Sequence, residues 1–191
     1  MAEHASQVEL TIDLGNDKSN TALQHLLSSL SLEAVVNQTL QMAAITQPVT
    51  LTLLITSDEA IRNLNKQYRG QDKPTDVLSF PLLDWPIVEA PADQLWTPTE
   101  TPAGDIAETG STKQVFITPP EQTTNLGDIV ISWPTVLRQA AGAGHDPTYE
   151  LVYLLSHGVL HLIGYDDQTE AGYQAMVRIQ QAVMEATEQR A

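Results

Sequence analysis

Two histidines four residues apart are the side chains whose type and spacing most directly suggest chemistry. His157 and His161 stand in the segment HGVLHLIGYDD, residues 157–167. On a helix, positions four apart share one face, so both imidazoles can reach a single metal ion. Gly164 allows the helix to end, because glycine tolerates the left-handed backbone of a helix terminus. The turn can then return Asp167 to the same ion as a third ligand, which is the open arrangement of a catalytic zinc site.

Asp167 has competing interpretations. It can cap the last helix, with Glu170 three residues later completing an arrangement like a capping box, and Asp166 would then take the ligand role. It can also do both, with one oxygen on the metal and the other on a backbone amide. The chain has no cysteine, so a transition metal must be held by histidine and carboxylate. The prediction is one zinc ion held by His157, His161 and Asp167.

The residue that directly follows the first histidine bears on the catalytic mechanism. Metalloproteases with this histidine spacing place a glutamate after the first histidine as the general base, whereas this chain has Gly158. The metal alone must therefore activate its water, or a group from elsewhere must help. Glu150 lies on the same helical face, and two roles are open for it. It either orients an imidazole or complements the helix dipole in the first turn.

The distribution of charge limits the classes of ligand. The formal net charge of −15 argues against general affinity for nucleic acids, which requires clustered Lys and Arg. Four of the nine cations nevertheless fall at spacings of four, three and four, which is one stripe of a helix: Arg62, Lys66, Arg69 and Lys73. This basic stripe is either a solvated face or an edge that contacts an anion.

The elements that must position these residues follow from periodicity and from capping signals. Alternating or continuous apolar residues predict strands over residues 8–14, 49–56, 76–80 and 127–132. Helical spacing and caps predict helices over about residues 26–44, 57–70, 134–144, 146–162 and 168–188. The prediction is an α/β (α+β) fold, in which a small mixed sheet packs with helices and the metal site lies on a central helix.

Length and composition predict a single domain over residues 1–191, expected to be cytoplasmic and without a membrane span or signal peptide. Residues 82–125 are an exception within it, because they hold six prolines and a single basic residue, Lys113. This segment is predicted to be a long loop or insertion that contributes little to the core. Its Trp85 and Trp96 either pin it to the surface or are isolated anchors of a mobile loop.

Three motifs, in order, resemble the YbeY family of metal-dependent endoribonucleases. Residues 157–166 match the family signature H-G-x-L-H-L-x-G-Y-D-H, and the chain departs from it at the last position, where Asp167 replaces histidine. Residues 65–81, NKQYRGQDKPTDVLSFP, resemble the family's N-x-x-Y-R-G-x-D-K-P-T-[DN]-V-L-S-F-P, and residues 127–132 match its GDIVIS strand. The resemblance covers about residues 49–81 and 126–185.

This resemblance implies zinc at the three signature positions and cleavage of single-stranded RNA. It further implies a part in ribosomal RNA maturation, notably at the small-subunit 3′ end, and in ribosome quality control, with the ribosome or its proteins as partners. Arg69, the arginine of the Y-R-G motif, is implied to be catalytic, and a guanidinium suits a scissile phosphate. Two alternatives remain: a metallohydrolase of peptides or small esters, and a non-catalytic ribosome assembly factor with a structural metal.

Overall fold

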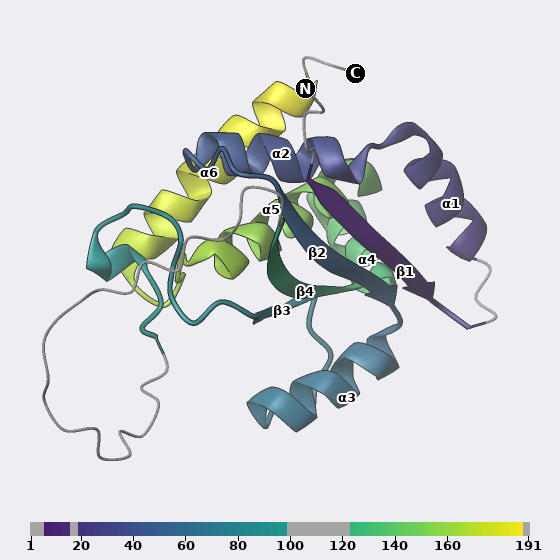
Figure 1. Ribbon diagram of the computed structural model, residues 1–191. Coiled ribbons are helices and arrows are strands. Elements are labelled where there is room, and N and C mark those ends of the chain that lie inside the picture. Colours follow the sequence, from purple (N-terminus) through teal and green to yellow (C-terminus); the bar gives the residue numbers. More distant parts are fainter. Residues whose placement is uncertain (1–5, 16–18, 99–122, 189–191) are drawn as a thin grey trace, which may run out of the picture.

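The structure is a computed structural model that describes residues 6–15, 19–98 and 123–188. This described part contains a sheet of four strands in the order β1-β2-β4-β3 (Figure 1). The strands are β1 (Gln7–Asp13), β2 (Val49–Thr56), β3 (Val77–Pro81) and β4 (Thr124–Ser132). Strands β1, β2 and β4 are parallel, whereas β3 pairs antiparallel with β4 at one edge. The predicted α/β fold with a small mixed sheet is confirmed.

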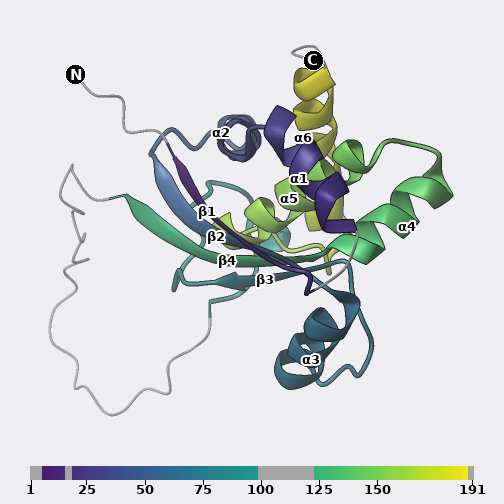
Figure 2. The ribbon, with the colours of Figure 1, turned by 90° about the vertical axis from the view of Figure 1, so that its right-hand side faces the viewer.

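Helices cover the two faces of the sheet unequally. They are α1 (Ser19–Ser29), α2 (Leu32–Met42), α3 (Asp58–Arg69), α4 (Trp133–Ala143), α5 (Pro147–Ile163) and α6 (Glu170–Glu188). Figures 1 and 2 place α3 on one face and the other helices on the opposite face. Helix α5 contacts β3, β4, α2, α4 and α6, so the predicted site lies on a central helix.

The sheet has a hydrophobic core on each face, and side chains that alternate along the central strands contribute to one core or the other. Ile129 and Ile131 of β4 are fully buried in the main core, which α2, α5 and α6 complete. Val130 points to the other face and packs with Ile61 of α3 and Leu78 of β3. Because successive side chains of a strand point to opposite faces, a continuous apolar run suits a strand covered on both sides. The sheet thus holds α5 and α3 apart on its opposite faces.

One helix predicted over residues 26–44 proves to be two. Helix α1 begins earlier, at Ser19, and the chain leaves the helical path at Leu30. Ser31 then caps α2, because its side chain accepts a hydrogen bond from the amide of Ala34. A serine cap satisfies a backbone donor at the start of a new helix, and this outweighs the continuous apolar periodicity. No helix in the described ranges is both long and apolar enough to cross a membrane.

Part of the predicted insertion packs firmly, which corrects the expectation for residues 82–98. Val88 is 6% exposed and joins the main core, and the amide of Ile87 donates to the carbonyl of Ile163 at the end of α5. A short 3-10 helix, η1 (Ala92–Gln94), follows. Residues 99–122 lie outside the described residues, and the last two residues of the predicted insertion, 124 and 125, already belong to β4.

Candidate metal centre

Helix α5 begins with a strong cap and lies very close to the sheet. Asp146 accepts a hydrogen bond from the amide of Thr148, and Pro147 occupies the first turn. A Cβ placed at Gly158 would lie 2.9 Å from two side-chain carbons of Ile129, which leaves no space for a larger residue. Position 158 therefore faces β4, and no side chain there can act as a base beside the histidines.

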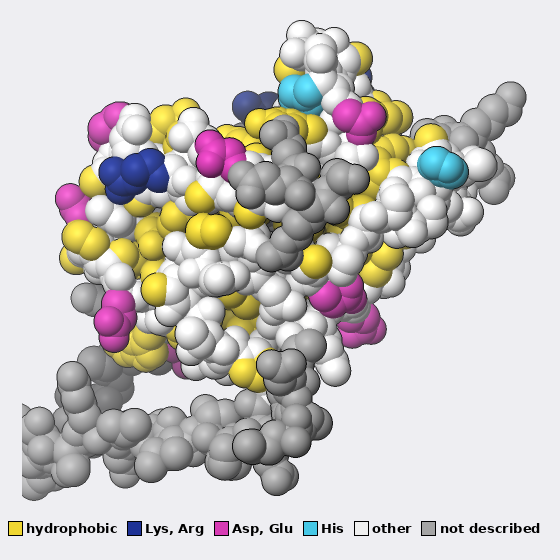
Figure 3. Space-filling model, turned by 90° about the horizontal axis from the view of Figure 1, so that it is seen from above, with side chains coloured by type: hydrophobic (Ala, Val, Ile, Leu, Met, Phe, Trp, Pro, Cys, Tyr) yellow, Lys and Arg dark blue, Asp and Glu magenta, His cyan; other side chains and the backbone are white. Residues whose placement is uncertain are grey.

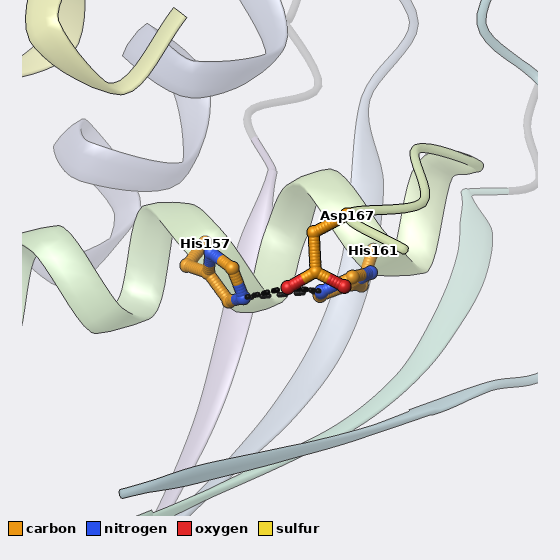
Figure 4. Close-up of side chains that lie close together, drawn as sticks. All are labelled: His157, His161 and Asp167. Atoms are coloured by element: carbon orange, nitrogen blue, oxygen red, sulfur yellow. Dashed lines mark hydrogen bonds and ion pairs between the residues drawn. The ribbon is translucent and has the colours of Figure 1, made fainter. Parts of the chain in front are cut away.

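The histidines and Asp167 converge as the sequence predicted (Figure 4). The Nε2 atoms of His157 and His161 are 3.0 Å apart, and the Oδ2 atom of Asp167 is 3.7 Å from each of them. Bonds of 2.0–2.1 Å to a tetrahedral zinc ion place its ligand atoms about 3.3 Å apart. The three observed separations lie within about 0.4 Å of this value, so the donor atoms are close to the spacing that a tetrahedral ion requires.

The protonation of the His161 ring is decided by its neighbour. Its Nδ1 atom lies 2.9 Å from the carbonyl oxygen of Tyr165, which can only accept, so Nδ1 carries the proton. In the neutral ring, Nε2 then presents a lone pair toward His157 and Asp167. Burial is the largest cause that lowers the pKa of His157, so this ring favours its neutral form. The 3.0 Å between the two Nε2 atoms fits a hydrogen bond donated by His157, and it also fits two lone pairs directed at one cation.

Asp167 is free of the alternative role as a helix cap. The capping residue of α6 is Thr169, whose Oγ1 accepts from the amide of Gly172 and whose carbonyl accepts from the amide of Tyr173. Asp166 is engaged in the turn, because its Oδ1 accepts from the amide of Gln168. Interaction with the His161 ring is the largest cause that lowers the pKa of Asp167 to about 2, so this carboxylate is ionised at neutral pH.

The turn that carries Asp167 is supported by the packed segment 82–98. Gly164 has a φ of 133°, and a Cβ there would lie 2.4 Å from the Pro86 ring, so the turn requires glycine. The indole Nε1 of Trp96 donates to the carbonyl of His161, and its amide donates to the carbonyl of Gly164. The amide of Asp166 donates to the carbonyl of Gln94. Sequence reasoning raised anchoring by Trp96 only as one of two possibilities and did not identify its partner.

The histidines and Asp167 line a groove of about 560 Å³ that has two walls. The metal wall is formed by residues 157–168 and the facing wall by the end of α3 and by β3, with Tyr68, Arg69 and Phe80. Arg69, the predicted catalytic residue, therefore lines the same groove as His157 and His161. Among the described residues no carboxylate pairs with Arg69, so its guanidinium can bind a ligand.

The residues of the predicted basic stripe have two different roles. Arg62 and Lys66 both pair with Asp72, at 2.7 and 3.1 Å, and lower its pKa. These exposed pairs join α3 to the loop that follows it. The buried Asn65 adds a further link, because its Nδ2 donates to the carbonyl of Lys73. The stripe is thus partly an internal clamp, and Arg69 is the member of it that lines the groove.

Asp58 fixes the other end of α3. Its carboxylate accepts hydrogen bonds from Ser132, Thr135 and Arg138, at 2.5, 2.9 and 2.7 Å. The hydrogen bond from Arg138 is the largest cause that lowers the pKa of Asp58. Local spacing shows Asp58 only as an acidic residue in the first turn of its helix, where it complements the helix dipole, and does not reveal these distant partners.

Glu150 does not orient either histidine of the site. It lies at the start of α5, where its carboxylate is 3.1 Å from Nε2 of His145. Burial raises the pKa of Glu150, and the neighbouring His145 opposes that rise. The interpretation of Glu150 as a second-sphere partner of the metal is therefore wrong, and its place in the first turn fits the helix-dipole alternative.

Two imidazoles and one carboxylate beside an open groove, opposite a guanidinium, form a donor set of the class found in metal-dependent hydrolases. Comparison with known families narrows this class. The sequence model of the family described as Endoribonuclease YbeY matches residues 13–188. The chain therefore belongs to the YbeY family of endoribonucleases, as the three motifs predicted.

Individual relatives agree with this assignment. The chain is similar to Endoribonuclease YbeY of Dehalococcoides mccartyi, at 38% identity over 83% of this chain and 87% of the relative. It is also similar to Endoribonuclease YbeY of Roseiflexus sp., at 38% identity over 80% of this chain and 78% of the relative. A solution structure of a protein from Thermotoga maritima matches with a TM-score of 0.48 and 20% identity, covering 96% of this chain and 93% of that one.

Proposed function

We propose that this protein is a metal-dependent endoribonuclease that cleaves single-stranded RNA with one zinc ion held by His157, His161 and Asp167. The observation that carries the proposal is the convergence of two imidazole Nε2 atoms and an ionised carboxylate in the groove that Arg69 also lines. The family's name supports RNA as the substrate. Three protein donors leave a coordination position open, which favours a catalytic over a structural metal.

Each residue of the site has a definable task in such a reaction. A bound zinc ion would supply Lewis acidity and a water molecule of lowered pKa. The Tyr165 carbonyl holds the His161 ring so that Nε2 faces the ion position. Arg69 can grip the scissile phosphate with its planar fork of donors and stabilise the negative charge that develops there.

The alternatives are less well supported. A peptidase of this histidine spacing needs a base at position 158, which is glycine here and where a Cβ would be crowded by the buried Ile129 side chain. A purely structural zinc site is usually closed by four protein ligands, whereas the described residues bring three together at this position.

The cellular role that we propose is maturation of ribosomal RNA, notably at the small-subunit 3′ end, together with ribosome quality control in the cytoplasm. The family membership supports a role in RNA processing. The ribosome or its proteins would then bring the substrate to the groove. This matters for a chain of net charge −15, because its own attraction for phosphate is weak. Figure 3, which looks onto the side covered by α2 and α6, shows only scattered Lys and Arg on that face.

The test is cleavage of a defined single-stranded RNA by metal-free protein before and after addition of zinc. We expect cleavage only with zinc, and none by His157→Ala under the same conditions. Product ends identify the nucleophile, because attack by the substrate 2′-hydroxyl leaves a cyclic phosphate and attack by water does not. Intact RNA with zinc-loaded protein, in the presence of a folded far-UV spectrum, would refute the proposal.

A further inference from the structure

The facing wall of the groove ends in an exposed aromatic residue that the catalytic scheme does not use. Tyr68 is 60% exposed and directly precedes Arg69 at the end of α3. Both residues line the groove that His157 and His161 also line. A single exposed tyrosine is ordinary on a protein surface and needs a further reason before it is given a function.

That reason is the way in which the Tyr68 ring is held. It makes an edge contact with Phe80, with ring centroids 5.1 Å apart and an angle of 67° between planes. Phe80 in turn packs against the small core between α3 and the sheet, beside Ile61 and Leu78. The ring is therefore braced through Phe80 while most of its surface remains open. Such a braced, exposed ring offers a flat platform whose ordering cost has largely been met before a ligand arrives.

The charges around the groove indicate what such a platform binds. Asp76, Asp166 and Asp167 line the groove together with a single guanidinium, that of Arg69. Phosphates away from Arg69 and the metal position therefore meet a repulsive surface. A substrate that carries one phosphate per unit must gain affinity from its uncharged parts. Nucleobases meet this need, because every base has a face that stacks on an aromatic ring.

We propose that Tyr68 is a stacking platform for an unpaired base next to the scissile phosphate. This inference rests on the proposed function. The phosphate would lie on Arg69 and the neighbouring base on Tyr68, which places adjacent parts of the substrate on adjacent residues. A base inside a duplex is stacked on its neighbours and cannot lie on the tyrosine ring. The subsite thus gives a physical reason for a preference for single-stranded RNA.

The experiment compares three variants on one short single-stranded RNA, using zinc-loaded protein. Tyr68→Ala removes the platform, Tyr68→Phe keeps it, and Tyr173→Ala removes a similarly exposed tyrosine on α6, outside the groove. We expect KM to rise about tenfold in Tyr68→Ala, within the range of one stacked base, with kcat nearly unchanged. The other two variants should have the KM of the unaltered protein.

An abasic nucleotide makes the test specific for a base. The abasic nucleotide is placed in turn on each side of the cut. On one of the two sides it should raise KM of the unaltered protein by about the same factor and leave KM of Tyr68→Ala unchanged. If Tyr68→Ala cleaves with unaltered KM, or if the two effects simply multiply, the platform is refuted.

Binding separates this inference from the proposed function. Anisotropy of a labelled single-stranded RNA is measured with metal-free protein, in which no cleavage occurs. If the zinc-loaded protein leaves RNA intact but Tyr68→Ala still binds more weakly than Tyr68→Phe, the nuclease proposal fails and the base subsite stands. If the RNA is cleaved and binding is independent of Tyr68, the nuclease stands and the subsite fails.

Discussion

The metal wall of the groove is built mainly from one continuous segment, residues 157–168, whereas the facing wall combines the end of α3 with β3. The metal wall is mostly buried, and its geometry comes from one helical turn and a glycine turn. In the facing wall Tyr68 and Arg69 are exposed, and their place depends on how the sheet holds α3. The metal ligands are therefore positioned mainly by local structure, with support from residues 82–98, while substrate handling is a property of the assembled fold. Mutations in the two walls should have separable effects.

The largest effect is expected for His157→Ala in the metal wall. Removal of an imidazole that faces the ion position should lower zinc affinity by more than the roughly 10–100-fold lost with a ligand's hydrogen-bond partner. Activity should become undetectable at stoichiometric zinc. Elemental analysis after gel filtration measures the retained metal. Full zinc content in this variant would remove His157 from the ligand set.

Arg69→Ala in the facing wall should lower activity without lowering zinc content. Loss of a donor that stabilises the developing charge costs about 10²–10³-fold in kcat, and zinc content should not change. Arg69→Lys keeps the charge but loses the fork of donors, so it should recover only part of the rate. A loss of zinc in Arg69→Ala would show that the walls are not independent.

Asp167→Asn tests the residue in which this chain departs from the family signature. The amide keeps the shape but removes the negative charge, so zinc affinity should fall by roughly tenfold or more, and excess zinc should restore activity. Asp166→Asn is the matched control, because its carboxylate holds the turn and not the ion position. Competition with a chromophoric chelator measures both affinities. Equal affinities in the two variants would exclude Asp167 as a ligand.

The smallest effect is expected for Asp58→Asn, which loosens the attachment of α3. Loss of its ion pair with Arg138, a partly exposed group, should lower the free energy of unfolding by about 1–2 kcal/mol. Because the pKa of Asp58 is lowered in the folded state, this contribution is present above the ordinary value of 3.8 and is lost as the pH falls through the lowered pKa.

Urea unfolding at neutral and acidic pH checks this expectation. The difference between Asp58→Asn and the unaltered protein should be largest near neutrality and should shrink on acidification. Zinc content should remain full, because α5 does not depend on Asp58. Arg138→Gln should cost a similar amount, and the double variant should cost less than the sum. A stability difference that grows toward acid would contradict the assignment.

The sequence predicted the metal wall better than the facing wall, and the reason is physical. His157 and His161 are related by helical periodicity, and Gly164 marks the turn, so local rules place them without knowledge of the fold. Arg69 was assigned through resemblance to a family, because no local rule brings the end of α3 near α5. Their proximity depends on the antiparallel pairing of β3 with β4, which the sequence alone does not specify.

Two further differences have equally specific causes. The break at Leu30 was missed because apolar periodicity continues through it, although Ser31 carries a recognisable cap signal. Residues 82–98 were predicted to pack poorly, because their prolines and acidic residues dominate the composition. Their packing depends on a few side chains, among them Val88 and Trp96. Composition averages over a segment, whereas docking is decided by individual contacts.

The attachment of Trp96 to α5 has a thermodynamic consequence. Its indole donates to the carbonyl of His161, and its amide donates to the carbonyl of Gly164, at the end of α5 where the turn that leads to Asp167 begins. A ligand that stabilises that turn therefore also favours docking of residues 82–98. By linkage, docking of residues 82–98 stabilises the turn to the same extent. Occupation of the metal position should therefore slow amide hydrogen exchange in this docked segment. Opening of the segment should, to the same extent, weaken the hold on the metal.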